Sequence, residues 1–317
     1  YRGYDSAGVA FKKNGSISVT KNLGRVNQLT KKLNLKTNQS NLGIAHTRWA
    51  THGIPSKKNA HPHHSKNIFV VHNGIIENHD DLRAYLKAEG IRFSTQTDTE
   101  VIGHLIRTFT EKGQSFEKAV FNTIKKLKGA YALGIIDKNN PEQIIGVRNQ
   151  SPLVLGKGFE ENFIASDVMA LAPVTNKFTY LDDGQVALLS SHKTVVKNIS
   201  SKIVRTKTYE VDSNAYTNDM AGFSHFMEKE IFEQPEAVKK SIEGRLSKNE
   251  TQEGIFGAGF EAAVNNITNI QIVACGTSFH SARIFEFWSH KFLGINCRVD
   301  YGLSLIHISE PTRRAII

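Results

Sequence analysis

The sequence predicts an α+β domain of stacked sheets and helices over about its first two hundred residues, followed by the beginning of an α/β domain. Short apolar runs and helical segments follow one another without the regular repeat of a doubly wound fold. Two segments carry apolar residues at helical spacing, which suits helices that cover sheet faces. From Ile270 the pattern changes to an apolar run, a polar loop and a helical stretch, which is the order of a strand–loop–helix unit.

The strands of the first domain are expected where short apolar runs lie between polar breaks, and two buried sheets would account for them. These runs are residues 43–46, 68–72, 130–137, 144–148, 153–156 and 163–166. A further pair of apolar arms spans residues 180–189 on either side of Asp183 and Gly184. Asp-Gly between such arms predicts a tight β-hairpin.

Two helices have recognisable ends. Asn78 is expected to cap a helix that runs to about Ala88, with acidic residues in its first turn and Gly90 just past its end. Ser115 is expected to cap a second helix, which Gly129 would end.

A domain boundary is expected after residue 208. Residues 208–222 are polar and poorly periodic, and the stretch after them predicts a connecting helix that breaks at Pro235. We expect the α/β unit that begins at Ile270 to be less than a whole domain, because fewer than about fifty residues remain after Ile270 and such a domain normally needs at least about one hundred.

Composition favours a globular protein over a membrane or secreted one. No apolar run approaches the roughly 20 residues of a membrane span, and the first residues lack the basic-then-apolar order of a signal peptide. We expect a cytoplasmic location and no membrane partner. Cys275 and Cys297 fit neither a disulfide framework nor a paired zinc motif and are expected as free thiols.

The chain is basic, with a net charge of +10 and a pI near 9.4. Such a balance can indicate nucleic acid or a phosphorylated substrate. The lysines are scattered over segments that we expect to be exposed, and they are not interleaved with aromatic residues as in a single-strand binder. The sequence therefore indicates no nucleic-acid partner.

The segment richest in chemical groups lies between His46 and Asn78. Its histidines raise the hypothesis of a metal site; they are His46, His52, His61, His63, His64 and His72. No pair has the helical spacing of a metalloprotease motif, no acidic residue accompanies them at such spacing, and Pro55 and Pro62 indicate a loop. Metal binding is therefore the weaker interpretation, and no metal ligand is assigned.

The stronger interpretation is a pocket for an amino acid. The Arg48 guanidinium suits a carboxylate, the Thr51 hydroxyl adds a donor, and Asp98 suits an ammonium group. Asn73 and Gly74, after an apolar strand, supply a side-chain amide and an unhindered N–H. These are the parts of an oxyanion hole, which points to acyl chemistry on an amide.

Each of these residues also has an ordinary structural interpretation. Trp49 alone is more often a core residue, and Asn73 with Gly74 alone is more often a turn. Asp98 alone would be read as the cap of the helix that follows it. It is the combination that favours an amino-acid pocket.

Motifs in a fixed order carry a resemblance to a known family. They are YRGYDSAG at 1–8, HTRWATHG at 46–53, NAHPH at 59–63, VHNGIIEN at 71–78 and TDTE at 97–100. Together they resemble glutamine:fructose-6-phosphate aminotransferase, also called glucosamine-6-phosphate synthase, over residues 1–302. They also separate the chain from other class II amidotransferases such as amidophosphoribosyltransferase and asparagine synthetase.

The resemblance implies a domain order. A four-layer αββα N-terminal-nucleophile glutaminase domain is expected at residues 1–212, a linker at 213–247 and the beginning of a sugar-isomerase domain at 248–302. Residues 303–317 resemble the translation of a transposase adapter used in sequencing libraries, and we expect them to be foreign to the natural protein.

The resemblance also implies roles for matching residues. Arg48 and Thr51 would bind the α-carboxylate of glutamine, and Asp98 would bind its α-ammonium group. Asn73 and Gly74 would form the oxyanion hole.

Further residues would surround the same ligand. Trp49 and His52 would lie on the loop that closes over glutamine, and Trp49 would help gate the ammonia path. His61 would line the site, and Arg2 would lie near the nucleophile.

The loop after the apolar run at Ile270 resembles the sugar-phosphate loop of the family's isomerase domain. It contains Gly276, Thr277 and Ser278, whose N–H groups and hydroxyls at a helix start suit a phosphate. Cys275, at the end of the predicted strand, is expected to pack rather than to act as a nucleophile.

The chain departs from the family at its nucleophile. In relatives this is a cysteine at the mature N-terminus, whose own α-amino group can serve as base. No cysteine precedes Cys275 here, and the phenol of Tyr1, with a pKa of about 10, is a poor substitute at neutral pH. We therefore expect the chain as given to be inactive.

The intact parent is expected to convert glutamine and fructose 6-phosphate to glutamate and glucosamine 6-phosphate, without a metal or organic cofactor and as a homodimer. Two other functions stay open. One is a non-catalytic module that binds an amino acid or a sugar phosphate. The other is a sugar-isomerase-domain regulator that binds nucleic acid through an added domain, against which the lack of a helix-turn-helix pattern before Ile270 counts.

Overall fold

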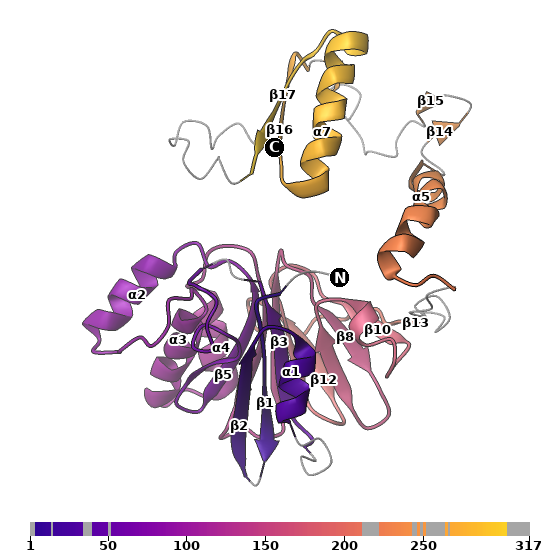
Figure 1. Ribbon diagram of the computed structural model, residues 1–317. Coiled ribbons are helices and arrows are strands. Elements are labelled where there is room, and N and C mark those ends of the chain that lie inside the picture. The colour runs from indigo at the N-terminus through magenta and orange to yellow at the C-terminus, as the bar shows by residue number, and fades with distance from the viewer. Residues whose placement is uncertain are drawn as a thin grey trace. The chain divides into compact units, whose positions relative to one another are not determined.

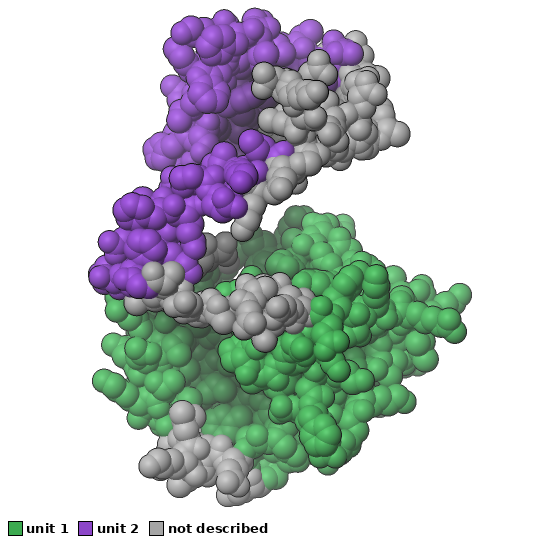
Figure 2. Space-filling model, turned by 90° about the vertical axis from the view of Figure 1, so that its right-hand side faces the viewer, with its two compact units in different colours: residues 1–218 green, residues 219–317 purple. Residues whose placement is uncertain are grey.

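The computed structural model describes residues 4–13, 15–33, 40–49, 52–210, 222–242, 246–247, 250–251, 264–265 and 267–302. The chain forms two compact units, residues 1–218 and 219–317, which Figure 2 colours separately. Arg2 and Thr51 lie outside the described residues, and so does the predicted adapter segment 303–317.

Unit 1 contains, in its described part, three antiparallel sheets. Their strand orders are β12-β11-β7-β6-β5-β4, β2-β1-β3 and β13-β10-β8-β9. The strands are β1 (Ser6–Lys13), β2 (Ser16–Leu23), β3 (Gly43–Arg48), β4 (His63–Ser65), β5 (Ile68–Gly74), β6 (Tyr131–Asp137), β7 (Ile144–Asn149), β8 (Val154–Lys157), β9 (Asn162–Ala165), β10 (Lys177–Tyr180), β11 (Gln185–Leu189), β12 (Thr194–Asn198) and β13 (Tyr209–Glu210).

Strand β6 shows how the six-stranded sheet is buried on both faces. Tyr131, Leu133 and Ile135 belong to the core that this sheet forms with helices α3 (Glu100–Glu111) and α4 (Phe116–Ile124). Ala132 and Ile136, which alternate with them, pack toward the two smaller sheets. A strand that is apolar at every position therefore lies between a helical layer and a second layer of sheet.

Helices complete the layers on both sides (Figure 1). Helix α2 (His79–Ala88) adds Leu82 and Leu86 to the α3–α4 core, and the short helix α1 (Val26–Lys32) packs on β1 and β2. The order is helix, sheet, sheet, helix, which confirms the predicted α+β fold with αββα layers. All the strands predicted from short apolar runs are present, with ends shifted by one or two residues.

The predicted hairpin at residues 180–189 is wrong, although its turn exists. Gly184 has φ +76° and the Gln185 N–H donates to Asp182 O at 3.2 Å. Strand β10 before the turn pairs with β8, whereas β11 after it pairs with β7. The turn therefore joins two sheets, because burial of the apolar arms against different partners outweighs the local pairing preference.

The two predicted helices form, but two of their predicted ends differ. Ser115 accepts from Lys118 N and caps α4 as expected. Asn78 precedes α2 without capping it, since its amide donates to Lys126 O and accepts from Lys128 N, both at 2.9 Å. Helix α4 ends at Ile124, before Gly129.

Unit 2 contains the predicted strand–loop–helix unit. Strand β16 (Asn269–Ala274) leads into α7 (Gly276–Trp288) and a π-helical turn at Ser289–Leu293, and β17 (Asn296–Tyr301) returns parallel to β16. Two-residue strands β14 (Leu246–Ser247) and β15 (Glu250–Thr251) form a small pair. This confirms the change to an α/β pattern at Ile270.

Two expectations for unit 2 are corrected. Helix α5 (Phe226–Ile242) continues through Pro235 instead of breaking there. Most of its described side chains are exposed, so water can solvate the carbonyl that loses its helical partner at a proline. Cys275 is exposed rather than packed, while Cys297 is buried; both are free thiols.

A substitution on β6 tests the double burial of the central sheet. Ile135 is 0% exposed, so Ile135→Ala should lower the free energy of unfolding by about 2–5 kcal/mol through lost burial and a residual cavity. Urea denaturation followed by circular dichroism measures this. Ile203→Ala, at a side chain that is 74% exposed, is the control and should change stability by less than about 0.5 kcal/mol. Equal losses in the two variants would contradict the layered core.

Candidate functional site

Arg48, at the end of β3, is a buried cation that organises the loop after it. Its side chain is 4% exposed, and Nη2 donates to the carbonyl oxygens of His52 at 2.6 Å and Gly53 at 2.9 Å. Nη1 lies 3.4 Å from Asp5 Oδ1, which supplies a neighbouring negative charge. The guanidinium therefore holds the loop at residues 52–53 against the end of the sheet.

Asp98 is a buried carboxylate in the segment just before helix α3. It is 3% exposed, its Oδ2 accepts from Ile76 N at 2.9 Å, and the same oxygen lies 3.8 Å from His72 Nδ1. The N-cap residue of α3 is Thr99, so Asp98 does not cap this helix. Its side chain instead ties the start of α3 to the segment that leaves β5.

Asn73 and Gly74 end strand β5 at a point where only glycine fits. Gly74 has φ +116°, and a Cβ there would lie 2.0 Å from Ala130 O. Beside it, Asn73 Oδ1 is hydrogen bonded to His46 Nε2 at 2.8 Å. The pair is therefore held in a defined conformation between β3 and the loop before β6.

A cluster of buried histidines lies beneath these groups. His61 Nε2 and His72 Nδ1 share the Thr99 hydroxyl, at 3.1 and 2.9 Å, and His63 Nε2 lies 3.2 Å from Thr97 Oγ1. The His61 ring centroid is 4.2 Å from that of His46 and 4.6 Å from that of His63.

Burial keeps these imidazoles neutral at physiological pH. Desolvation, assisted by the charge of Lys21, lowers the pKa of His63 to about 3. Desolvation, opposed by Asp98, lowers the pKa of His72 to about 4, and it lowers the pKa of His61 well below its ordinary value. The cluster therefore places polar but uncharged rings beside Asp98.

The remaining predicted residues are placed differently. Trp49 is 64% exposed, which excludes the core interpretation, and the His52 ring lies 4.9 Å from that of His79. Gly276, Thr277 and Ser278 lie exposed at the N-terminal turn of α7 in unit 2. Within the described residues, no group of three or more His, Cys, Asp or Glu side chains could hold a metal ion. Likewise, no helix in that part of the chain is long and apolar enough to cross a membrane.

Three contributors to the site were not identified from the sequence. Asp5 pairs with Arg48, and Thr99 is hydrogen bonded to two histidines. The Asn59 side-chain amide donates to Gln96 Oε1 and accepts from Gln96 N. Each lies inside a motif of the resemblance, so position within the motifs was the available signal.

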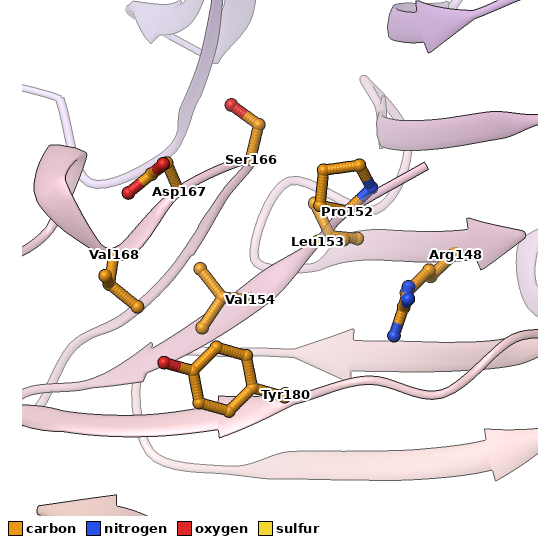
Figure 3. Close-up of a pocket in the computed structure, with 8 residues that line it drawn as sticks. All are labelled: Arg148, Pro152, Leu153, Val154, Ser166, Asp167, Val168 and Tyr180. Atoms are coloured by element: carbon orange, nitrogen blue, oxygen red, sulfur yellow. The ribbon is translucent and has the colours of Figure 1, made fainter. Parts of the chain in front are cut away.

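A separate cavity of about 260 Å³ lies elsewhere in unit 1 (Figure 3). It opens beside strands β8 and β10, and none of its lining residues was predicted as functional. They are Arg148, Pro152, Leu153, Val154, Ser166, Asp167, Val168 and Tyr180.

The neutral histidines predict a loss of stability in acid. Because the pKa of His63 is lower in the folded state than the ordinary value of about 6.5, the unfolded chain binds more protons as pH falls below about 6.5. Between pH 7 and pH 5 this one residue should cost about 2 kcal/mol of unfolding free energy.

Urea denaturation at both pH values measures this loss. His63→Gln can still bond the Thr97 hydroxyl, and it should reduce the acid loss by about 2 kcal/mol. His192→Gln, at an exposed loop position, is the control and should leave the acid loss unchanged. If His63→Gln behaves like the control, the imidazole of His63 is not held neutral by the fold.

Comparison with known proteins places this geometry in context. Residues 46–173 match the family model described as "Glutamine amidotransferase domain". Curated relatives named glutamine:fructose-6-phosphate aminotransferase (isomerizing) include one from Acinetobacter baylyi, 44% identical over 95% of this chain, and one from Shewanella oneidensis, 42% identical over 95%. This chain spans 49% of the length of each, about half of the relatives that it matches.

Solved structures show the same fold. An enzyme titled an allosteric regulatory enzyme of purine biosynthesis is 25% identical over 64% of this chain and 44% of its own, with a TM-score of 0.54. A glutamine phosphoribosylpyrophosphate amidotransferase from B. subtilis is 18% identical over 94% of this chain and 60% of its own, with a TM-score of 0.58, which shows a shared fold alone. Unit 1 therefore has the class II glutamine amidotransferase fold. The chain belongs to the glutamine:fructose-6-phosphate aminotransferase family, of whose members it spans about half the length.

Proposed function

We propose that this chain is part of an enzyme that takes ammonia from glutamine and transfers it to fructose 6-phosphate, giving glutamate and glucosamine 6-phosphate. The observation that carries the proposal is a series of contacts that connects the predicted residues. Arg48 holds Gly53, and Asp98 holds Ile76 two residues beyond Gly74. Asn73 then bonds His46, which is on the same strand as Arg48.

The two buried charges suit the two ends of an amino acid. Arg48 is assigned to the α-carboxylate, with Thr51, and Asp98 to the α-ammonium group. Because the histidines next to Asp98 are neutral, no full positive charge from them competes with a ligand ammonium group. Such an arrangement favours a zwitterion over a simple anion or cation.

The chemistry on the side-chain amide is assigned to Asn73 and Gly74. When a thiolate attacks the amide carbon, the carbonyl oxygen gains negative charge, and the Asn73 amide and Gly74 N–H would stabilise it. The α-amino group of the attacking cysteine, having taken the thiol proton, would return it to the amide nitrogen as the intermediate collapses. The C–N bond then breaks, ammonia leaves, and the thioester that remains is hydrolysed by water to glutamate and the free thiol. The cysteine that the family uses for this step has no counterpart before Cys275.

The other residues of the glutamine site keep the roles that the resemblance implies. Trp49 and His52 are assigned to the loop that closes over glutamine, His61 to its wall and Arg2 to the neighbourhood of the nucleophile. The exposure of Trp49 supports a place on a covering loop more than a place in the core.

The acceptor side of the reaction is assigned to unit 2. Gly276, Thr277 and Ser278 begin helix α7, where unpaired N–H groups and hydroxyls favour a phosphate. The relatives are named for fructose 6-phosphate and for isomerization, which supports a sugar phosphate as acceptor. A sugar-isomerase domain from residue 248, a linker at 213–247 and a cytoplasmic homodimeric parent remain parts of the proposal that rest on the resemblance, and no nucleic-acid partner is included.

The assignment of Asp98 predicts a loss of affinity for glutamine. Asp98→Asn keeps the shape of the side chain but removes the charge that attracts an ammonium group, so the Kd for glutamine should rise about 10- to 100-fold. Ligand-observed NMR titration of the 317-residue chain measures it. Asp80→Asn, at a side chain 87% exposed in the first turn of α2, is the control. Equal affinities in both variants would refute the ammonium assignment.

A polypeptide of this sequence should bind glutamine without hydrolysing it. Its cysteines are Cys275 and Cys297, which lie in unit 2, whereas the proposed amide site lies in unit 1. A coupled assay for glutamate should show no release above background. Release that persists when both cysteines are changed to alanine would overturn the thioester step for this family member.

A further inference from the structure

Glu100 is a buried carboxylate with an unusual number of hydrogen bonds. It is the first residue of α3 and is 2% exposed. Oε1 accepts from Ser94 N at 2.7 Å and Ser94 Oγ at 2.8 Å. Oε2 accepts from Thr95 N and from Thr95 Oγ1, both at 2.6 Å. The side chain therefore binds both the backbone and the hydroxyls of two successive residues.

The charge of Glu100 is compensated from several sides. His104, one turn along the helix, donates to Oε1 at 3.3 Å, and its other ring nitrogen lies 2.8 Å from Ser65 Oγ. Burial alone would raise the pKa of Glu100, but the hydrogen bonds from His104, Thr95 and Ser94 outweigh it and hold the pKa below its usual range. Glu100 is therefore ionised and fully bonded at neutral pH.

These bonds close a loop that contains Asp98. The carboxylate of Glu100 accepts from residues 94 and 95, so the residues that flank the segment 96–99 are bonded to each other. On the other side Arg83 donates to Thr95 O at 3.2 Å and Thr97 O at 2.7 Å. Asp98 thus lies between two anchored residues, Thr97 before it and Glu100 after it.

Glu100 itself does not reach the predicted ligand groups. Its described hydrogen bonds go to Ser94, Thr95 and His104, and the carboxylate that bonds Ile76 N is that of Asp98. Glu100 therefore acts on the ligand indirectly, and Asp98, which lies in the loop that Glu100 anchors, is the ligand group it can position.

We propose that Glu100 is a positioning residue for ligand selection: by closing the 94–100 loop it fixes the Asp98 carboxylate, and it thereby sets how strongly the site prefers an amino acid over the same molecule without its α-ammonium group. The proposal rests on the assignment of Asp98 to the ammonium group made above. A charged anchor suits this task, because five donors around one carboxylate allow few alternative loop conformations.

The test compares glutamine with 4-carbamoylbutanoate, which is glutamine without its α-amino group. Glu100→Gln keeps the size of the side chain but offers one acceptor oxygen and an NH₂ group to the same donors, so the loop loses part of its anchor. The Kd for glutamine should rise about tenfold, and the Kd for 4-carbamoylbutanoate should change less than twofold, because this analogue has no group for Asp98. Ligand-observed NMR titration of the full chain measures both.

Matched variants separate positioning from loss of structure. Glu111→Gln removes a carboxylate from the other end of the same helix, where it bonds Lys66 and Arg107, and should leave both affinities unchanged. Asp98→Asn should abolish the preference for glutamine, and adding Glu100→Gln to it should cause no further loss of preference. If Glu100→Gln weakens both ligands equally, or neither, the positioning role is overturned.

The outcome for Asp98→Asn distinguishes the two proposals. If that variant alone leaves the preference for glutamine intact, the ammonium assignment in the proposed function fails, whatever Glu100→Gln does. Ser94→Ala with Thr95→Val provides a second route in case Glu100→Gln does not fold, because it removes two hydroxyl donors from the loop side and leaves the carboxylate. It should shift the preference in the same direction, and an unchanged preference in this folded variant overturns the proposal.

Discussion

The site depends on the close approach of two backbone segments where strand β5 ends. A Cβ at Gly74 would lie 2.0 Å from Ala130 O, and one at Gly129 would lie 2.3 Å from Ile75 O. Both residues have φ +116°, so each is a glycine for steric and for conformational reasons. The pairing continues past β5, with Ile75 N donating to Ala130 O and Glu77 N donating to Lys128 O. This pairing presents Asn73 at the strand end and brings Ile76 N to Asp98.

The electrostatic character of the site depends on two buried charged residues, Arg48 and Asp98, and on histidines that are uncharged. Arg48 and Asp98 are buried, but each is bonded to backbone groups that fix its direction. His61 and His72 share the Thr99 hydroxyl, and burial lowers the pKa of both so that they are neutral. A site with ionised ends and a neutral floor is suited to a zwitterion, whereas charged imidazoles there would repel an ammonium group.

The sequence was a good guide to the strands of the buried sheet and a poorer one to the rest of unit 1. Runs such as β6 are apolar at every position because both faces are covered, so they stand out. Strands β1 and β2 did not stand out. Strand β2 has serine, threonine, lysine and asparagine among its apolar residues and is mostly half-buried, whereas β1 contains small residues and ends in two lysines. Asn78 was read as a cap from its type and position, yet its amide bonds a loop some fifty residues away, a contact that no local pattern contains. The same holds for Pro235, whose tolerance depends on the exposure of its helix.

The motifs showed where the site residues lie in the sequence but not which role each of them has. The TDTE motif contains two acidic residues, Asp98 and Glu100, two positions apart. Residue type alone does not distinguish their roles. In the fold the Asp98 carboxylate accepts from Ile76 N, just past β5, and at 3.5 Å from the Thr99 hydroxyl. The Glu100 carboxylate accepts from five donors of its own loop and helix. The cost of burying Glu100 is met by bonds formed on folding, so ordering of the Asp98 loop is not left to the moment of binding. The ligand ammonium group is then attracted by an Asp98 carboxylate that is already in position. Glu100 can therefore affect which ligand binds without contacting the ligand itself.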